Sequence, residues 1–142
     1  FPIAFPTGIE LQHGTADNKA DLMFSDQRSI SASSSENLDL AGSLTDAYGQ
    51  ALTFVKVKGI YVRAAAVNGG NIVIGGASSN AFVGPFGAAN DVIKIPAGGY
   101  LEFVAPVAGW PVTAGTGDIL QIANDDSGAA GVYDIVIFGA SA

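Results

Sequence analysis

From about residue 36 onward, apolar and polar residues alternate in short runs that are typical of β-strands. The run 52–58 shows the pattern, with Val55 and Val57 on one face and Lys56 and Lys58 on the other. Similar runs lie at 71–74, 92–95, 100–104, 118–122 and 132–138. Gly, Pro or Asn residues separate them, and the Asn-Gly-Gly turn at 68–70 favours a hairpin.

The alternation shifts by one residue past Gly59. Ile60 and Val62 share the buried face of Val57 only if one extra residue is inserted at Lys58-Gly59. A β-bulge or a sharp bend provides that residue, and Gly is the residue type that permits it. The sequence therefore predicts one irregular strand across this region.

Seven or eight short strands with this punctuation predict an all-β protein. No long amphipathic helical pattern separates the strands, which argues against a parallel α/β sheet. We expect an antiparallel β-sandwich that is jelly-roll-like, with an extended N-terminal arm. The sequence separates this topology poorly from an immunoglobulin-like sandwich or a barrel.

Residues 1–35 differ from the rest of the chain. They hold one weak strand candidate at 8–12, a polar stretch that favours one or two helical turns at 17–24, and a serine-rich run at 29–35. We interpret 1–35 as an N-terminal arm or linker and 36–142 as the sandwich domain. Arms of this kind often contact a neighbouring subunit, so Phe1 and Phe5 are candidate interface residues. The start, Phe-Pro-Ile-Ala-Phe-Pro, is too short and too rich in proline for a signal peptide, and the first residue, Phe, indicates a processed, trimmed or renumbered terminus.

Charge is scarce for a chain of 142 residues. Charged residues make up 13% and apolar residues 49%, against about 25% charged residues in a typical soluble domain. No apolar run is long enough to suggest a membrane span. A neutral exterior suits surfaces that become buried between subunits, although a monomer with a neutral surface is the alternative. The net charge of −7 argues against binding to nucleic acid or to anionic membranes.

The sequence gives little support for catalysis or for a cofactor. His13 is the only histidine, there is no Cys, and no Gly-x-Ser-x-Gly motif occurs, so we expect His13 to be solvated or at a strand edge. Asp91, Asp118 and Asp134 lie near strand starts, as turn residues do, and Glu102 is predicted to face solvent from mid-strand. We therefore expect no enzyme, and a hydrolase remains a minor alternative.

The loop 124–128, with sequence Asn-Asp-Asp-Ser-Gly, offers oxygen ligands that suit calcium. It lacks the spacing of an EF-hand, so a hairpin turn is the favoured interpretation and we assign no metal.

The basic residues Lys56, Lys58 and Arg63 form the one basic concentration in the sequence. They favour solvation and edge protection of a strand, with a docking patch for an acidic neighbour as the functional alternative. Trp110 either closes one end of the core or anchors an interface. These four residues complete the candidate interface set.

Five stretches, 52–63, 72–82, 95–106, 110–124 and 133–139, resemble small β-rich proteins encoded among the virion structural genes of tailed bacteriophages. The resemblance covers roughly the last 100 residues and excludes the arm. Its most similar motifs are Ile-Gly-Gly-Ala-Ser-Ser-Asn-Ala-Phe at 74–82, Val-Thr-Ala-Gly-Thr-Gly-Asp at 112–118 and Tyr-Asp-Ile-Val-Ile at 133–137.

The resemblance implies a structural protein located in the virion, most simply a capsid decoration or cement subunit that stabilises the head shell. Its expected partners are the major capsid protein or other virion subunits, and the chain itself is expected to form trimers or dimers. The family implies no catalytic residues. The alternative is a receptor- or glycan-binding module of a phage fibre or tail, which would expose aromatic residues such as Trp110, Tyr61, Tyr100 or Phe86.

Overall fold

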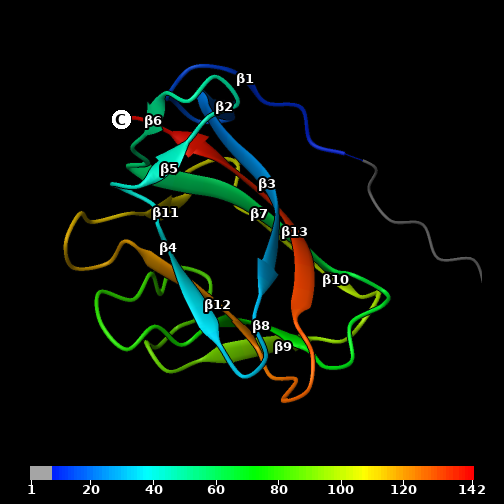
Figure 1. Ribbon diagram of the computed structural model, residues 1–142. Coiled ribbons are helices and arrows are strands. Elements are labelled where there is room, and N and C mark those ends of the chain that lie inside the picture. Colours follow the sequence, from blue (N-terminus) through cyan, green and yellow to red (C-terminus); the bar gives the residue numbers. More distant parts are fainter. Residues whose placement is uncertain (1–7) are drawn as a thin grey trace, which may run out of the picture.

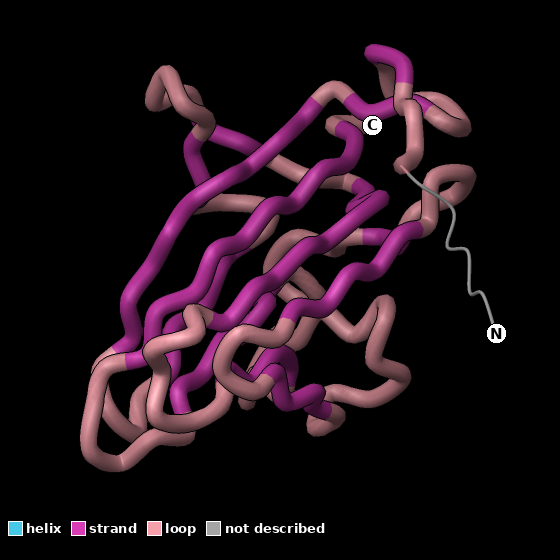
Figure 2. Tube along the Cα trace, turned by 90° about the vertical axis from the view of Figure 1, so that its right-hand side faces the viewer, coloured by secondary structure: helices cyan, strands magenta, loops and turns pink. Residues whose placement is uncertain are grey.

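The computed structural model describes residues 8–142, and this part of the chain is built from strands, turns and loops. Figures 1 and 2 show two layers of strands joined by loops at both ends. Among the described residues, no helix is long and apolar enough to cross a membrane. The all-β class predicted from the sequence is confirmed.

The described residues form eight strands of four or more residues, which we call the main strands, and five strands of two residues. The strands are β1 (Gln12–His13), β2 (Lys19–Ala20), β3 (Leu22–Ile30), β4 (Ser35–Asp39), β5 (Leu44–Thr45), β6 (Ala51–Leu52), β7 (Lys56–Ala64), β8 (Ile72–Gly75), β9 (Val92–Ile95), β10 (Tyr100–Val104), β11 (Trp110–Pro111), β12 (Ile119–Asn124) and β13 (Gly131–Ala140).

The main strands form two antiparallel sheets. The five-stranded sheet has the order β10-β7-β13-β3, with β11 also paired to β7, and the four-stranded sheet has the order β4-β12-β8-β9. The first main strand thus pairs with the last, β4 with β12, β7 with β10, and β8 with β9. This nested pairing is the jelly-roll arrangement, so the predicted jelly-roll-like sandwich is confirmed.

Most turns in this topology carry the chain from one sheet to the other. The turn at 68–70 joins β7 to β8, which lie in different sheets, so the predicted hairpin there is wrong. The loop at 125–130 likewise crosses between β12 and β13. Only β8 and β9 are consecutive main strands within one sheet, and a long loop over 76–91 joins them.

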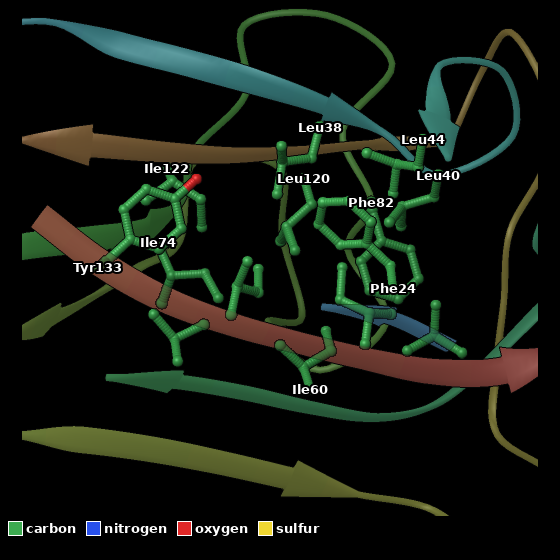
Figure 3. Packing of buried hydrophobic residues seen from close by; sticks show 14 of the residues in the cluster. Phe24, Leu38, Leu40, Leu44, Ile60, Ile74, Phe82, Leu120, Ile122 and Tyr133 are labelled. Carbon is green, nitrogen blue, oxygen red and sulfur yellow. The ribbon is translucent and has the colours of Figure 1, made fainter. Parts of the chain in front are cut away.

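The core fills the space between the sheets with aliphatic and aromatic side chains. Figure 3 shows Ile60 and Tyr133 from one sheet packing toward Ile74, Leu120 and Ile122 from the other. Each of these five side chains is at most 1% exposed. Alternating burial along β13 follows from the strand period of two, which directs every second residue inward.

The predicted irregularity in β7 is confirmed. The register of β13 against β7 shifts between Phe138 and Gly139, which pair with Gly59 and Val57 and leave Lys58 as the extra residue. Val57 is fully buried, as are the inward residues beyond the bulge. Val55 was expected on this buried face, but it precedes β7 and is 40% exposed.

The predicted boundary between an arm and the sandwich is wrong for residues 22–30. These residues form β3, which pairs along its whole length with β13 and contributes Phe24 and Ile30 to the core. The helical turns expected at 17–24 are likewise replaced by β2 and the start of β3. The sequence did not indicate β3 clearly because many of its side chains are polar. Its outward side chains face water.

A polar network closes the open side of the sandwich between β3 and β4. Arg28 Nε and Nη2 donate to Glu36 Oε2 over 2.9 and 2.8 Å, and Tyr133 Oη donates to Glu36 Oε1 over 2.6 Å. Burial, followed by the bond to Glu36, raises the pKa of Tyr133. The hydrogen bonds to Glu36 likewise raise the pKa of Arg28 above its ordinary value. Glu36 thereby joins the two sheets through charge-assisted hydrogen bonds.

Candidate functional site

An apolar groove lies on the outer face of the five-stranded sheet, where the segment 8–13 crosses above the strands. Its cavity volume is about 460 Å³. We call it the outer-face groove, and its lining residues are Ile9, Leu11, His13, Ala20, Asp21, Leu22, Met23, Glu102 and Phe138. Two of them, Met23 at 61% and Ile9 at 45%, are unusually exposed for large apolar side chains.

The floor of the groove results from the pairing of three strands. Met23 of β3 stands opposite Phe138 of β13, and Phe138 stands opposite Gly59 of β7. A Cβ atom at Gly59 would overlap the ring of Phe138, so the ring occupies the space that a side chain at position 59 would fill. The absence of a side chain at Gly59 therefore seats Phe138 low on the outer face, and the space above it becomes part of the groove.

The wall of the groove is held in place by contacts further along the N-terminal segment. Lys58 Nζ donates to the carbonyl oxygen of Ala16 over 2.5 Å, and the amide of Asn18 donates to the carbonyl of Pro106 over 2.9 Å. β1 then pairs with β2 in parallel, with Gln12 opposite Lys19 and His13 opposite Ala20. Leu11, two residues after Ile9, lines the groove from the same side of this extended segment.

Carboxylates mark the rim of the groove. Asp21 accepts hydrogen bonds from Ser141 N over 2.9 Å and from Ser141 Oγ over 2.5 Å. Burial raises the pKa of Asp21, but the bonds from Ser141 outweigh that effect and the pKa lies below its ordinary value. The carboxylate is thus engaged by Ser141 rather than by the imidazole of His13. The arrangement offers apolar contact with an acidic rim and no assembled nucleophile and base.

The outward positions of the four-stranded sheet are mostly uncharged, with Asp39 of β4 and Lys94 of β9 as the exceptions. Asn37 of β4 faces Gln121 of β12, whose Nε2 donates to Asn37 Oδ1 over 3.1 Å. Ala123 follows on β12 and pairs with Val73 of β8. Lys94, opposite Val73, is the nearest charged residue in this row. The outer face of the four-stranded sheet therefore carries few charged side chains, whereas Arg63, Glu102 and Asp134 project from the outer face of the five-stranded sheet.

The structure separates the residues predicted to form an interface. Lys58 is 1% exposed and bound to Ala16, so its predicted role in a docking patch is wrong. Lys56 and Arg63 lie at opposite ends of β7, about 23 Å apart along the strand. Phe1 and Phe5 lie outside the described residues.

Trp110 belongs to an aromatic group at the border of the core. Its ring meets Phe103 edge-to-face at 6.3 Å, and Phe103 meets Phe86 in the same way at 5.7 Å. Trp110 is partly buried and packs against the core cluster. Of the two roles weighed from the sequence, closure of the core is the one that these contacts support.

The residues discussed as candidate chemistry take up turn and surface roles. Asp118 Oδ2 accepts the amide of Gly115 over 2.5 Å, Asp91 Oδ2 accepts that of Ala88 over 3.0 Å, and Asp134 Oδ1 accepts Gln27 Nε2 over 2.8 Å. Glu102 is exposed, as predicted. Within residues 8–142, no three His, Cys, Asp or Glu residues lie together as a metal site would require.

The loop at 124–128 is held in place by hydrogen bonds to neighbouring segments of the chain. Asn124 is 3% exposed, and its Nδ2 donates to the carbonyls of Ile30, Ser31 and Ala129. Asp125 accepts the backbone and side-chain nitrogens of Asn71 over 2.6 and 2.9 Å, which lowers the pKa of Asp125. The predicted turn is confirmed, but it links two sheets instead of forming a hairpin.

Sequence reasoning missed the outer-face groove. A signal for it exists in the run Leu22-Met23-Phe24, where three consecutive apolar residues in a strand require cover on both faces of the sheet. The spacing of Ile9 and Leu11 is the matching signal in the segment that supplies part of this cover. Both lay in the stretch interpreted as an arm, where neither was expected to meet the sandwich.

A second surface feature on the outer face of the five-stranded sheet is a pair of tyrosines from β7 and β10. Tyr61 and Tyr100 stack at 5.9 Å with their planes tilted by 32°, and Tyr100 is 68% exposed. Arg63 is paired across the strands with Tyr100, and Glu102 with Tyr61. This group offers aromatic faces beside charged side chains.

Comparison with known proteins does not extend these observations. No protein-family model matches the chain, and no curated protein matches it. Its function is therefore argued from the fold and from the outer faces of the two sheets.

Proposed function

We propose that this chain is a non-enzymatic structural protein of a virion, and specifically a capsid decoration or cement subunit that stabilises a head shell. The observations that carry the proposal are the mostly uncharged outer face of the four-stranded sheet and the open, apolar outer-face groove on the five-stranded sheet. Contiguous apolar surface of this kind marks interaction sites on soluble proteins. The jelly-roll order supports the proposal, since viral capsid proteins use this architecture.

The mechanism is the burial of these faces across the junctions between subunits. A standard interface buries about 800 Å² on each partner, which is roughly a tenth of the 7604 Å² accessible surface of this chain. Two outer faces therefore allow each copy to contact both a neighbouring copy and the major capsid protein. Several weak contacts of this kind act jointly, because each contact raises the effective concentration for the next.

The scarcity of charge sets the character of these contacts. Removal of charged groups from water is costly unless they are paired, whereas burial of Ala and Val side chains is favourable and Ser and Asn side chains need only one or two hydrogen bonds to the partner. The faces of this chain fit a partner surface that is apolar and neutral. Because the remaining net charge is −7, contacts with a basic partner surface are favoured over contacts with an acidic one.

Binding to heads that lack the chain tests the proposal. Purified protein is mixed with such heads, the heads are sedimented, and the bound protein is measured together with the temperature at which the heads open. We expect saturable binding and a higher opening temperature. Gln121→Glu, on the outer face of the four-stranded sheet, is expected to weaken binding about tenfold.

The matched control is Val67→Glu, because Val67 lies in the loop between β7 and β8 and is already 89% exposed. This variant is expected to bind heads as the unchanged chain does. Absence of binding by the unchanged chain, with no change in head stability, would overturn the proposed function.

The tyrosine group favours one second candidate, a glycan- or receptor-binding module of a fibre or tail. Stacked, exposed aromatic rings beside Arg63 and Glu102 offer both a flat apolar face and hydrogen-bonding groups. A glycan array probed with the isolated chain separates the two candidates. Glycan binding that is lost in Tyr100→Ala, with no binding to heads, would favour the second candidate.

A further inference from the structure

The outer-face groove is apolar on its floor and is covered only in part by the described chain. Leu22, Met23 and Phe138 line it from the sheet, and Leu11 lines it from the crossing segment. Met23 remains 61% exposed although it stands beside Phe138 on the same face. An apolar segment that entered the groove would remove these side chains from water and would be stabilised by about 25 cal/mol for each Å² of apolar surface buried.

We propose that the outer-face groove of one copy binds residues 1–7 of a second copy of the chain. This inference deepens the proposed function, and it rests on that function only in requiring contacts between copies. It names the occupant of the groove by its sequence, Phe-Pro-Ile-Ala-Phe-Pro-Thr.

The composition of residues 1–7 fits this groove. Phe1, Ile3 and Phe5 are spaced by two residues, so an extended segment presents all three large apolar side chains on one side. Pro2 and Pro6 disfavour helix in the bound segment and lower the entropy lost on ordering it. No residue in 1–7 is charged. The segment therefore brings no carboxylate side chain toward the acidic rim formed by Asp21 and Glu102.

The direction of the chain favours a second copy as the source of the segment. Figure 1 shows the blue trace before β1 leading out from the top of the sandwich toward residue 8, and residues 8–10 are exposed. Ile9 and Leu11 already form one wall of the groove. Seven extended residues span at most about 25 Å, which reaches an adjoining subunit.

Exchange of this kind between identical subunits is self-complementary, because each copy offers one segment and one groove. A two-fold pair satisfies both grooves at once, whereas a ring of three does so head-to-tail. The dimer and the trimer expected from the sequence are both compatible with this contact.

The test uses the chain without residues 1–7 and a synthetic peptide with the sequence of residues 1–8. We expect the peptide to bind the shortened chain in a calorimetric titration. Met23→Glu in the shortened chain is expected to lower the affinity at least about tenfold, since it places a charge on the groove floor. Val67→Glu, exposed and remote in the sequence, is the matched control and is expected to bind the peptide unchanged. If Met23→Glu fails to fold, Met23→Gln replaces it.

Two results would overturn the inference. One is failure of the peptide to bind the shortened chain, or equal binding by the Met23 variant. The other is an unchanged mass in solution when residues 1–7 are removed, which would show that the segment does not join copies. The head-binding assay distinguishes failure of this inference from failure of the proposed function. Peptide binding without head binding contradicts only the cement role. Head binding without peptide binding contradicts only this contact.

Discussion

The ring of Phe138 lies directly over Gly59 on the outer face of the five-stranded sheet. The two residues are paired across β13 and β7, immediately beside the bulge that makes Lys58 the extra residue. A Cβ atom at position 59 would overlap the ring. The glycine thus serves two purposes, since it allows the strand to change register and it seats the aromatic floor of the outer-face groove.

Gly59→Ala is expected to destabilise the fold by about 1–3 kcal/mol, because the new methyl group displaces a packed ring. Chemical denaturation monitored by circular dichroism measures the loss. Gly117→Ala is the matched control, since its Cβ would meet no atom closer than 3.9 Å. Truncation of the ring in Gly59→Ala/Phe138→Ala should cancel part of the clash. Equal stability of Gly59→Ala and the unchanged chain would contradict this packing.

Tyr133→Phe tests the network that closes the side of the sandwich. The variant removes the hydroxyl that donates to Glu36 Oε1, while Arg28 stays bound to the other oxygen. We expect a loss of about 1–2 kcal/mol in the free energy of unfolding, as for one hydrogen bond to a charged group. Tyr48→Phe, at a side chain 92% exposed, is expected to change little. A neutral effect at both positions would show that the sheets are not joined there.

The raised pKa of Tyr133 predicts a loss of stability in alkali. In the unfolded chain this phenol ionises near its ordinary value of 10.0, whereas burial and Glu36 keep it protonated in the folded chain. The folded state therefore holds the proton longer, and stability falls as the pH rises above about 10. Unfolding curves across this range should show the fall. The Tyr133→Phe variant should show a shallower one, and an identical slope would contradict the assignment.

Lys58→Met tests how the N-terminal segment is held. The variant keeps an apolar stem of similar length but loses the bond to the carbonyl of Ala16. We expect faster amide hydrogen exchange in residues 8–20, with little change in β7 and β13. Lys56→Met, at the partly exposed neighbour on the same strand, should leave exchange in this segment unchanged. Unaltered protection of residues 8–20 in Lys58→Met would contradict the anchoring role.

Truncation separates the terminal segment from the sandwich. Removal of residues 1–7 should leave the fold intact, since the described core begins later in the chain. Removal of residues 1–30 deletes β3, uncovers one edge of β13 and takes Phe24 and Ile30 from the core, so this form is expected not to fold. Circular dichroism and thermal melts distinguish the two. A folded form that begins at residue 31 would restore the view of 1–35 as a separate arm.

Periodicity predicted most of the main strands well and β3 poorly. β9 and β10 match the predicted bounds, and the bulge in β7 follows from the shifted alternation past Gly59. β3 was missed because its inward positions include the charged pair Asp26 and Arg28, which interrupt the apolar alternation.

The pairing of strands and the groove depend on contacts far apart in the sequence. The turns at 68–70 and 97–99 look like hairpin turns locally, yet each carries the chain to the opposite sheet. Lys58 follows an outward alternation, but Ala16, 42 residues earlier, covers it. Neighbouring residues in the sequence predict neither the sheet-crossing turns nor the burial of Lys58, because both depend on how distant segments pack.

The central claim is that the outer face of the four-stranded sheet and the outer-face groove of the five-stranded sheet are covered by other subunits. The mass of the purified full chain in solution, measured by sedimentation across a range of concentrations, tests it most directly. For a chain of 14.3 kDa, we predict reversible association to a dimer of 2 × 14.3 = 28.6 kDa or a trimer of 3 × 14.3 = 42.9 kDa. A single species of 14.3 kDa at every soluble concentration would contradict the claim.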